Sequence, residues 1–369
     1  MELSESLRNA YGKDRLSAHE AQLRARFIAW GPVVFQVTRV MLERGILEML
    51  RNAPNGLLRE DIVWNTGMSD YAVKCLLEAS LCIGTVLIDA DTDTYFLGKT
   101  GWFLLSDPSA KVDIDFNHDV NYEGLFHLSD ALEKGKPEGL RHFGNWPTIY
   151  EGLSSLPPSV QDSWFAFDHF YSDHSFDQAL EIVFKKYCSR SLYDVGGNTG
   201  RWALQCVAYD SDVRVTVIDL PQQLEMMRKN IQGKRGYERI DAYGMNLLDE
   251  DCEFPEGRHV DAVWMSQFLD CFGMDEVKSI LRRARKIMDE DSRLYIMETI
   301  WNRQQYEPAA FVVTMISLYF TTMANGNSKM FNMEDIKECI EDSGLSIEEI
   351  HDGLGYGHTL LVCKIRKNN

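Results

Sequence analysis

A short glycine-rich segment between two apolar runs constrains the fold of this chain more than any other feature. The first run, residues 191–195, predicts a strand, and residues 213–218 predict a second strand that closes on Asp219. The turn between them contains Gly196, Gly197, Asn198 and Gly200. Glycines let a backbone approach a ligand closely, and an acid about 20 residues past such a turn can accept hydrogen bonds from a ribose. The segment therefore predicts a strand–turn–helix site for a nucleotide-type cofactor.

Strands and helices alternate from residue 191 to the end of the sequence. Apolar runs predict strands at 191–195, 213–218, 239–243, 260–265, 293–298 and 359–364. This alternation predicts an α/β domain with a Rossmann-like, doubly wound sheet, in which a cofactor lies at the carboxyl ends of the strands. We assign residues 186–369 to this cofactor-binding domain.

The first 110 residues predict a mostly helical domain with a small hairpin. An amphipathic segment at 24–44 precedes shorter helices, and Ser69 is a good N-cap for the last of them. One apolar stripe of that last helix is predicted at Ala72, Cys75, Leu76, Ala79, Cys82 and Ile83. Residues 85–90 and 94–98 predict two strands, which completes the order of a winged helix. Residues 111–185 predict a helical connector that is rich in aromatic side chains and lines a substrate pocket.

The charge of the chain argues against nucleic acid as a partner. The formal net charge is -18 and the pI about 4.9. Residues 57–100 contain three Lys or Arg against seven Asp or Glu, whereas a DNA-reading helix needs clustered positive charge. We therefore predict that residues 1–110 serve dimerisation.

Cysteine spacing and apolar runs indicate the cellular location of the protein. The eight Cys include no Cys-x-x-Cys pair, so neither a metal site nor a redox motif is predicted. The N-terminus lacks the pattern of a signal peptide. The longest apolar run, residues 311–324, is too short for a bilayer span and carries several hydroxyls. These features predict a cytoplasmic protein with reduced thiols and no membrane contact.

Several ordered segments give the chain a resemblance to a known enzyme family. They are 47–107, 171–175 (Tyr-Ser-Asp-His-Ser), 194–200 (Asp-Val-Gly-Gly-Asn-Thr-Gly), 218–221 (Ile-Asp-Leu-Pro) and 261–272. The chain resembles the S-adenosylmethionine-dependent O-methyltransferases of the caffeic-acid and hydroxyindole type. The resemblance implies a class I methyltransferase fold and a homodimer formed through the N-terminal domain. It also implies S-adenosyl-L-methionine as cofactor, S-adenosyl-L-homocysteine as product, and a small aromatic hydroxyl compound as acceptor.

The resemblance implies roles for individual residues. The implied cofactor-binding residues are Tyr171, Ser175, Gly196, Gly197, Asn198, Gly200, Asp219, Leu220, Met245, Asn246, Ser266 and Gln267. The implied walls of the acceptor pocket are Phe167, Met315 and Tyr319. The catalytic pair is Asp270, which stands where the family has its catalytic His, and Glu298, which matches one of two glutamates that flank that His. Asn246 and Ser266 also depart from the family pattern, which has an acid and a lysine there.

An aspartate at the position of the base changes the expected proton chemistry. A phenol ionises near pH 10, so an ordinary aspartate with a pKa of about 3.9 is mismatched by roughly six units, or about 8 kcal/mol. Burial raises carboxyl pKa values by a few units. Three interpretations of Asp270 follow: a general base with a raised pKa, a group that orients an already acidic acceptor, or a pocket wall in an enzyme with altered chemistry. Among the other candidate bases, His169, His174 and His358, we expect His174 to be structural and His358 to lie at the surface.

Other functions are compatible with the same features. The turn of residues 194–200 is also compatible with a dinucleotide site or an ordinary strand–turn–helix, although the leading Asp194 is typical of adenosylmethionine sites. Within the resembling fold, methylation of carbon or nitrogen, or a reaction without methyl transfer, is an alternative. A winged-helix regulator that senses a metabolite is a more remote one.

Overall fold

Two units make up the chain in the computed structural model, which describes residues 2–255, 257 and 259–367. The smaller unit is Asp14–Asp119, and the larger combines Met1–Lys13 with Val120–Asn369. Most of the connector expected at 111–185 falls within the larger unit, and its boundaries stay a prediction.

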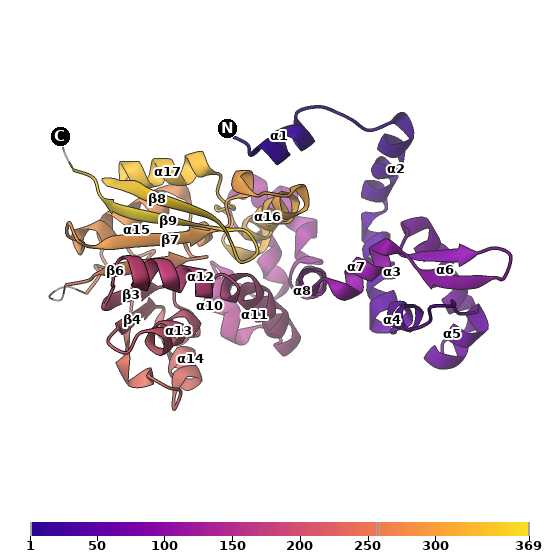
Figure 1. Cartoon of the computed structure of the whole chain (residues 1–369), viewed down its shortest axis with the longest axis horizontal. Coiled ribbons are helices and arrows are strands. Elements are labelled where there is room, and N and C mark those ends of the chain that lie inside the picture. The colour runs from indigo at the N-terminus through magenta and orange to yellow at the C-terminus, as the bar shows by residue number, and fades with distance from the viewer. Residues whose placement is uncertain (1, 256, 258, 368–369) are drawn as a thin grey trace. The chain divides into compact units, whose positions relative to one another are not determined.

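The smaller unit consists of helices and one hairpin (Figure 1). Its elements are α2 (Ala18–Ala29), α3 (Gly31–Glu43), α4 (Ile46–Arg51), α5 (Arg59–Thr66), α6 (Asp70–Ile83), β1 (Val86–Asp89), β2 (Thr94–Leu97), α7 (Lys99–Ser106) and α8 (Pro108–Phe116). The strands β1 and β2 pair antiparallel, as expected for residues 85–98. The Ser69 hydroxyl accepts a hydrogen bond from the backbone N–H of Ala72 at 3.2 Å, which confirms the predicted N-cap.

Two local expectations for this unit are wrong. The predicted helix at 24–44 is two helices, because α2 ends before Trp30 and Pro32 lies in the first turn of α3. In α6, the buried side chains are Val73, Leu77 and Ser80, and the predicted stripe is not the buried one. Since α6 is apolar over much of its circumference, the neighbouring elements α3 and β1 decide which face is buried.

The larger unit is built on a seven-stranded sheet in the order β5-β4-β3-β6-β7-β9-β8. Its strands are β3 (Ser191–Val195), β4 (Arg214–Asp219), β5 (Ile240–Gly244), β6 (Ala262–Ser266), β7 (Arg293–Glu298), β8 (Leu345–Leu354) and β9 (His358–Ile365). The strands β5, β4, β3, β6 and β7 are parallel, and β9 and β8 are antiparallel additions. The chain therefore has the class I methyltransferase fold. All six predicted strands are present, and only β8 was not predicted.

Helices cover both faces of the sheet (Figure 1). The α-helices of the larger unit are α1 (Glu5–Tyr11), α9 (Leu128–Lys134), α10 (Ile149–Gly152), α11 (Pro158–Asp173), α12 (Phe176–Leu180), α13 (Arg201–Tyr209), α14 (Pro221–Ile231), α15 (Met274–Lys286), α16 (Glu307–Tyr319) and α17 (Met333–Asp342). Short 3-10 or π segments are η1 (Asn117–Asn121), which crosses the unit boundary, and η2 (Gly124–His127), η3 (Glu138–His142), η4 (Leu153–Ser155), η5 (Glu181–Lys186), η6 (Tyr237–Arg239), η7 (Leu269–Cys271), η8 (Trp301–Arg303) and η9 (Phe320–Ala324).

Alternate residues of each strand enter different cores. In β6, Val263 packs with side chains of α15 and α17, whereas Trp264 packs with side chains of α12, α13 and α14. Strands buried on both faces read as continuous apolar runs, which is why the parallel strands were recognisable in the sequence.

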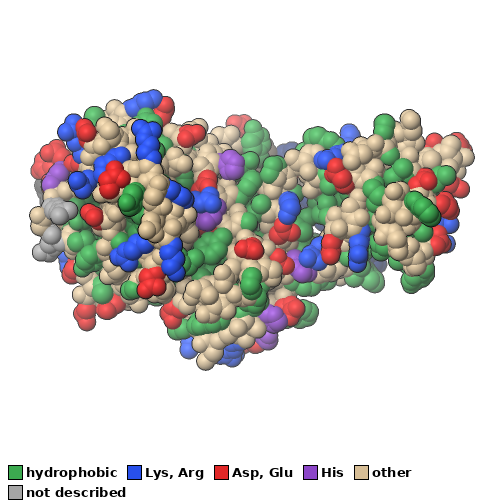
Figure 2. Space-filling model, turned by 90° about the horizontal axis from the view of Figure 1, so that it is seen from below, with side chains coloured by type: hydrophobic (Ala, Val, Ile, Leu, Met, Phe, Trp, Pro, Cys, Tyr) green, Lys and Arg blue, Asp and Glu red, His purple; other side chains and the backbone are tan. Residues whose placement is uncertain are grey.

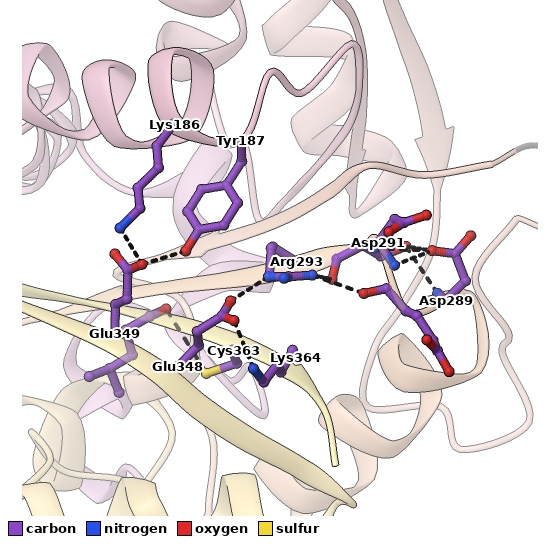
Figure 3. A network of polar contacts seen from close by, with 12 residues as sticks. Lys186, Tyr187, Asp289, Asp291, Arg293, Glu348, Glu349, Cys363 and Lys364 are labelled. Atoms are coloured by element: carbon purple, nitrogen blue, oxygen red, sulfur yellow. Dashed lines mark hydrogen bonds and ion pairs between the residues drawn. The ribbon is translucent and has the colours of Figure 1, made fainter. Parts of the chain in front are cut away.

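Polar contacts attach the edge strand β8 to its neighbours (Figure 3). The Glu348 carboxylate accepts hydrogen bonds from Arg293 of β7 at 2.6 Å and Lys364 of β9 at 2.7 Å. The Glu349 carboxylate accepts one from the Tyr187 hydroxyl at 2.7 Å and pairs with Lys186. Two register shifts interrupt β8, so charged residues and bulges obscure the period-2 pattern that would have predicted this strand.

Within the described residues, one helical stretch, Glu307–Ala324, is long and apolar enough to cross a membrane by length and composition. The expectation that this region is too short rested on residues 311–324, whereas the helix begins at Glu307. Tyr319 and Met323 are buried inside the larger unit. Core helices of soluble proteins pass the same test, so the finding is weak evidence for a membrane span.

Candidate functional site

The glycine turn after β3 has the backbone that its residues predict. Gly196 and Gly200 have φ of +73° and +77°, and Asn198 has φ of +49°. A Cβ atom at Gly197 would stand 2.7 Å from the Asp194 carboxylate, and one at Gly196 would stand 2.2 Å from the ring of Phe268. Glycine is therefore required at 196 by conformation and by a close neighbour, and at 197 by a close neighbour.

Asp219 ends β4 beside this turn. Its Oδ2 accepts a hydrogen bond from the backbone N–H of Asn198 at 2.9 Å, and its Oδ1 accepts one from that of Leu220 at 2.7 Å. Burial raises the pKa of Asp219 to about 6. Burial, followed by the charge of Asp219, raises the pKa of Asp194 to about 8. Each Asp219 oxygen keeps lone-pair capacity for a further donor, as a ribose-binding acid requires.

Unsatisfied polar atoms gather at the ends of β3 and β6. Among the described residues, Asp194 Oδ2, Asn198 Oδ1, Ser266 Oγ and Gln267 Oε1 are buried and lack hydrogen-bond partners. Gln267 also has a positive φ of 45°, which a glutamine rarely adopts. Buried polar atoms without partners are costly, so their concentration beside a glycine turn fits a polar ligand that would satisfy them.

The other predicted cofactor residues occupy different environments. The Met245 side chain is in the core, while its backbone N–H donates to the Asp219 carbonyl at 2.9 Å. Asn246 is exposed, and its Oδ1 accepts from the Leu248 N–H at 3.1 Å. Ser175 is fully buried and donates to the Ser172 carbonyl at 2.6 Å. Tyr171 packs on Phe167 with ring centroids 5.0 Å apart. Their roles toward a cofactor stay predictions.

Asp270 and Glu298 form a buried carboxyl pair. Asp270 lies in η7 and is 3% exposed, and Glu298 ends β7 and is 1% exposed. Glu298 Oε1 accepts hydrogen bonds from the backbone N–H groups of Phe268 at 3.1 Å and Leu269 at 2.9 Å. These bonds hold Glu298 against the segment that carries Asp270.

Burial sets the protonation of this pair. It raises the pKa of Asp270 to about 6, against hydrogen bonds from Cys271 and Glu298 that lower it. Burial, followed by the charge of Asp270, raises the pKa of Glu298 well above its usual range. Burial and the neighbouring charge of Asp270 therefore favour the neutral form of Glu298. The expectation of a raised-pKa carboxylate at position 270 agrees with this geometry.

Aromatic side chains surround the carboxyl pair. The Trp164 Nε1–H donates to the Tyr319 hydroxyl at 2.7 Å, and the pKa of Tyr319 is raised by burial and by nearby acids that include Asp270. The pKa of Tyr150 is raised well above its usual value, first by burial and then by the neighbouring Cys271 and Tyr319. Met315, predicted as a pocket wall, is 44% exposed, and its role stays a prediction.

The structure adds Asp168, which sequence reasoning missed. Its Oδ2 accepts a hydrogen bond from Asn198 Nδ2 at 3.2 Å. Burial, followed by the charges of Asp270 and Asp173, raises its pKa. Asp168 lies 30 residues before Asn198, and no local pattern links the two. The sequence offered one hint of its position, namely that Asp168 lies one helical turn after the aromatic Trp164 on α11.

The three candidate histidines differ in burial and in pKa. His358 is completely buried, so its predicted surface position is wrong; as the first residue of the inner strand β9 it lies between β7 and β8. Burial lowers its pKa to about 4. His169 is stacked on Phe165, and burial lowers its pKa to about 4 as well. His174 is exposed and bonded to the Phe170 carbonyl at 2.7 Å, which agrees with a structural role.

Within the part of the chain that the structure describes, no group of three His, Cys, Asp or Glu side chains is arranged to hold a metal ion. The candidate site consists of the glycine turn at 196–200 with Asp219 beside it, the unsatisfied polar atoms at the ends of β3 and β6, and the buried pair Asp270 and Glu298 with its aromatic neighbours.

Two family models match the chain. A Dimerisation2-like domain matches residues 22–95, and an O-methyltransferase domain matches residues 167–346, which include the glycine turn and the carboxyl pair. Residues 167–346 therefore belong to the O-methyltransferase domain family. The relatives found by these comparisons are O-methyltransferases of the caffeic-acid and hydroxyindole type.

Two curated relatives illustrate this family. The O-methyltransferase pgmB of Aspergillus terreus is 25% identical over 177 residues, which are 47% of this chain and 49% of the relative. The chain thus matches about half the length of that protein. The mitomycin biosynthesis 6-O-methyltransferase of Streptomyces lavendulae is 21% identical over 316 residues, 84% of each chain.

Solved structures share the fold. The S-adenosylmethionine-dependent methyltransferase SibL is similar with a TM-score of 0.70 and 19% identity, covering 92% of this chain and 98% of that one. NcsB1, an O-methyltransferase of neocarzinostatin biosynthesis solved with S-adenosylmethionine and 2-hydroxy-5-methyl naphthoic acid, has a TM-score of 0.65 and 17% identity, covering 90% and 95%.

Proposed function

We propose that this protein is an S-adenosyl-L-methionine-dependent O-methyltransferase that acts on a small aromatic hydroxyl compound. The observation that carries the proposal is the buried pair Asp270–Glu298 in the same unit as the ribose-type acid Asp219. Support for the acceptor class comes from relatives whose printed names concern mitomycin and a naphthoic acid.

The residues fit the cofactor that the family uses. Asp219 would accept hydrogen bonds from the ribose hydroxyls, and Gly196–Gly200 would accommodate the methionine part beside unsatisfied acceptors such as Asn198 Oδ1. Ser266 and Gln267, with their own unsatisfied oxygens, contribute to the adenosine side. When bound, S-adenosylmethionine supplies a methyl group on a positively charged sulfur.

Asp270 takes the proton of the acceptor hydroxyl. With a pKa of about 6, it is mismatched with a phenol by roughly four units, or about 5 kcal/mol, instead of about 8 kcal/mol for an ordinary aspartate. Glu298, whose neutral form burial favours, holds the segment that carries Asp270 through the backbone N–H groups of Phe268 and Leu269. The remaining barrier would be lowered by holding the acceptor in place beside the bound cofactor, which removes the entropy cost of encounter.

Incubation with methyl-labelled cofactor and a panel of phenolic acceptors tests this proposal. We expect label on an acceptor oxygen and formation of S-adenosyl-L-homocysteine. Label on carbon or nitrogen, or turnover without methyl transfer, would instead support another reaction of the same fold.

We also propose that residues 14–119 form a winged-helix-like dimerisation module of a cytoplasmic homodimer. Within this unit α2 contributes no buried residue, and Leu23 and Ile28 are 49% and 74% exposed, so apolar side chains of this otherwise mixed helix lack a cover. On the face shown in Figure 2, acidic side chains lie among basic ones over both units, which favours a protein partner over nucleic acid.

A further inference from the structure

One residue of the glycine turn contacts two acids from different elements. The backbone N–H of Asn198 donates to Asp219 Oδ2 at 2.9 Å, and its side-chain Nδ2 donates to Asp168 Oδ2 at 3.2 Å. Asp219 ends β4, and Asp168 lies in the third turn of α11. Asn198 has φ of +49°, a conformation that asparagine tolerates better than most residues other than glycine.

The charges around Asp168 make this hydrogen bond important. Asp270 and Asp173 repel its negative charge, and Arg201 attracts it, but Arg201 is already paired with Asp173. His169 Nε2 lies 4.0 Å away, and burial keeps this imidazole neutral at physiological pH. The Asn198 amide is thus a neutral donor that stabilises the carboxylate among other acids.

The Asp168 carboxylate remains accessible. Its side chain is 26% exposed, and the hydrogen bond from Asn198 occupies Oδ2. One turn earlier on α11, Trp164 is bonded to Tyr319, so Asp168 belongs to the aromatic surroundings of the carboxyl pair. A hydrogen-bond donor on an acceptor molecule can reach it.

We propose that Asn198 is a positioning residue that couples the cofactor turn to α11 and presents the Asp168 carboxylate to the acceptor. The inference rests on the proposed function. Its physical basis is that the side-chain amide reaches Asp168 only while the turn keeps the backbone conformation fixed by the bond to Asp219. Occupancy of the cofactor turn therefore orders the part of α11 that faces the acceptor.

Four variants and one probe test the coupling. S-adenosyl-L-homocysteine is titrated by calorimetry, and amide hydrogen exchange of residues 164–169 is compared with and without it. The variants are Asn198→Gly, Asn198→Asp, Asn198→Asp combined with Asp168→Asn, and Thr199→Ala as a matched control. Thr199 bonds His169, the neighbour of Asp168, at 3.3 Å, so this control removes an adjacent contact between the same two elements.

In the wild type, we expect bound S-adenosyl-L-homocysteine to slow exchange of residues 164–169 by roughly 10-fold or more, the scale of one hydrogen bond to a charged group. Asn198→Gly keeps the backbone N–H to Asp219 but removes the Oδ1 assigned to the cofactor, so affinity falls by no more than about 10-fold, the scale of one neutral hydrogen bond, while the protection is lost. Asn198→Asp loses the protection at alkaline pH, where the two facing carboxyls are both ionised and repel each other. The double variant regains it, because the amide introduced at position 168 donates to the carboxylate introduced at position 198. Thr199→Ala behaves as the wild type.

Unchanged protection in Asn198→Gly overturns the inference. A loss of affinity greater than about 10-fold together with loss of protection in that variant also overturns it, because Asn198 would then mainly maintain the turn. A wild-type protein that binds no S-adenosyl-L-homocysteine contradicts the proposed function itself, and this result is distinguishable before any variant is compared. For the best acceptor of the labelled-cofactor screen, Asn198→Gly should raise KM by roughly 10- to 100-fold with a smaller change in kcat.

Discussion

At the scale of single residues, Asp219 provides the sharpest test of the cofactor site. Its two oxygens are held by the backbone N–H groups of Asn198 and Leu220, so the carboxylate is oriented before any ligand arrives. Asp219→Ala removes charge-assisted hydrogen bonds to a ribose and should weaken S-adenosyl-L-homocysteine binding by about 1–3 kcal/mol. Calorimetry measures this change, and unchanged affinity would contradict the assignment of the site.

Asp270 is tested by the dependence of turnover on pH. A base must be ionised, so kcat/KM should rise with pH through an apparent pKa of about 6. Asp270→Asn should lower turnover by roughly 100-fold or more and remove this rise. Affinity for S-adenosyl-L-homocysteine serves as the control and should persist. Wild-type turnover in the variant would exclude the base and favour one of the other two interpretations of Asp270.

At the scale of elements, α15 is attached to the loop after β5 by one buried side chain. Arg283 is 4% exposed, and its guanidinium donates to the carbonyls of Leu247 at 2.5 Å, Asp249 at 3.0 Å and Cys252 at 2.9 Å. This loop follows the predicted cofactor residues Met245 and Asn246. Because the charge of this buried Arg is used in these carbonyl contacts, Arg283 has a structural role.

Arg283→Met should lower the free energy of unfolding by about 3 kcal/mol or more, because three carbonyls lose their charged donor. Chemical denaturation measures it. The exposed neighbour Arg282 offers a matched control, since Arg282→Met should change stability by no more than about 0.5 kcal/mol. Equal effects of the two substitutions would show that the carbonyl contacts contribute little.

At the scale of the whole molecule, the proposed homodimer explains why α2 has no buried side chain. The mass in solution should be about twice 42.4 kDa. Ile28→Glu places a charge on the uncovered apolar face and should shift the protein toward the monomer, because an unpaired charge is costly in an interface. Phe126→Glu, at a residue of the larger unit that is 85% exposed, should leave the mass unchanged. Light scattering across concentrations measures both, and a monomeric wild type would contradict the proposal.

The sequence alone determined the parallel strands, the glycine turn and Asp219 beside it, because continuous apolar runs and positive-φ residues are local signals. The family resemblance singled out Asp270 and Glu298, and the sequence placed Glu298 at a strand end. Only the tertiary structure decided that these carboxyls share a buried environment, that Asn198 reaches Asp168, that His358 is enclosed between strands, and which face of α6 is buried. These properties depend on desolvation and on contacts between segments far apart in the chain. Local periodicity carries no information about either.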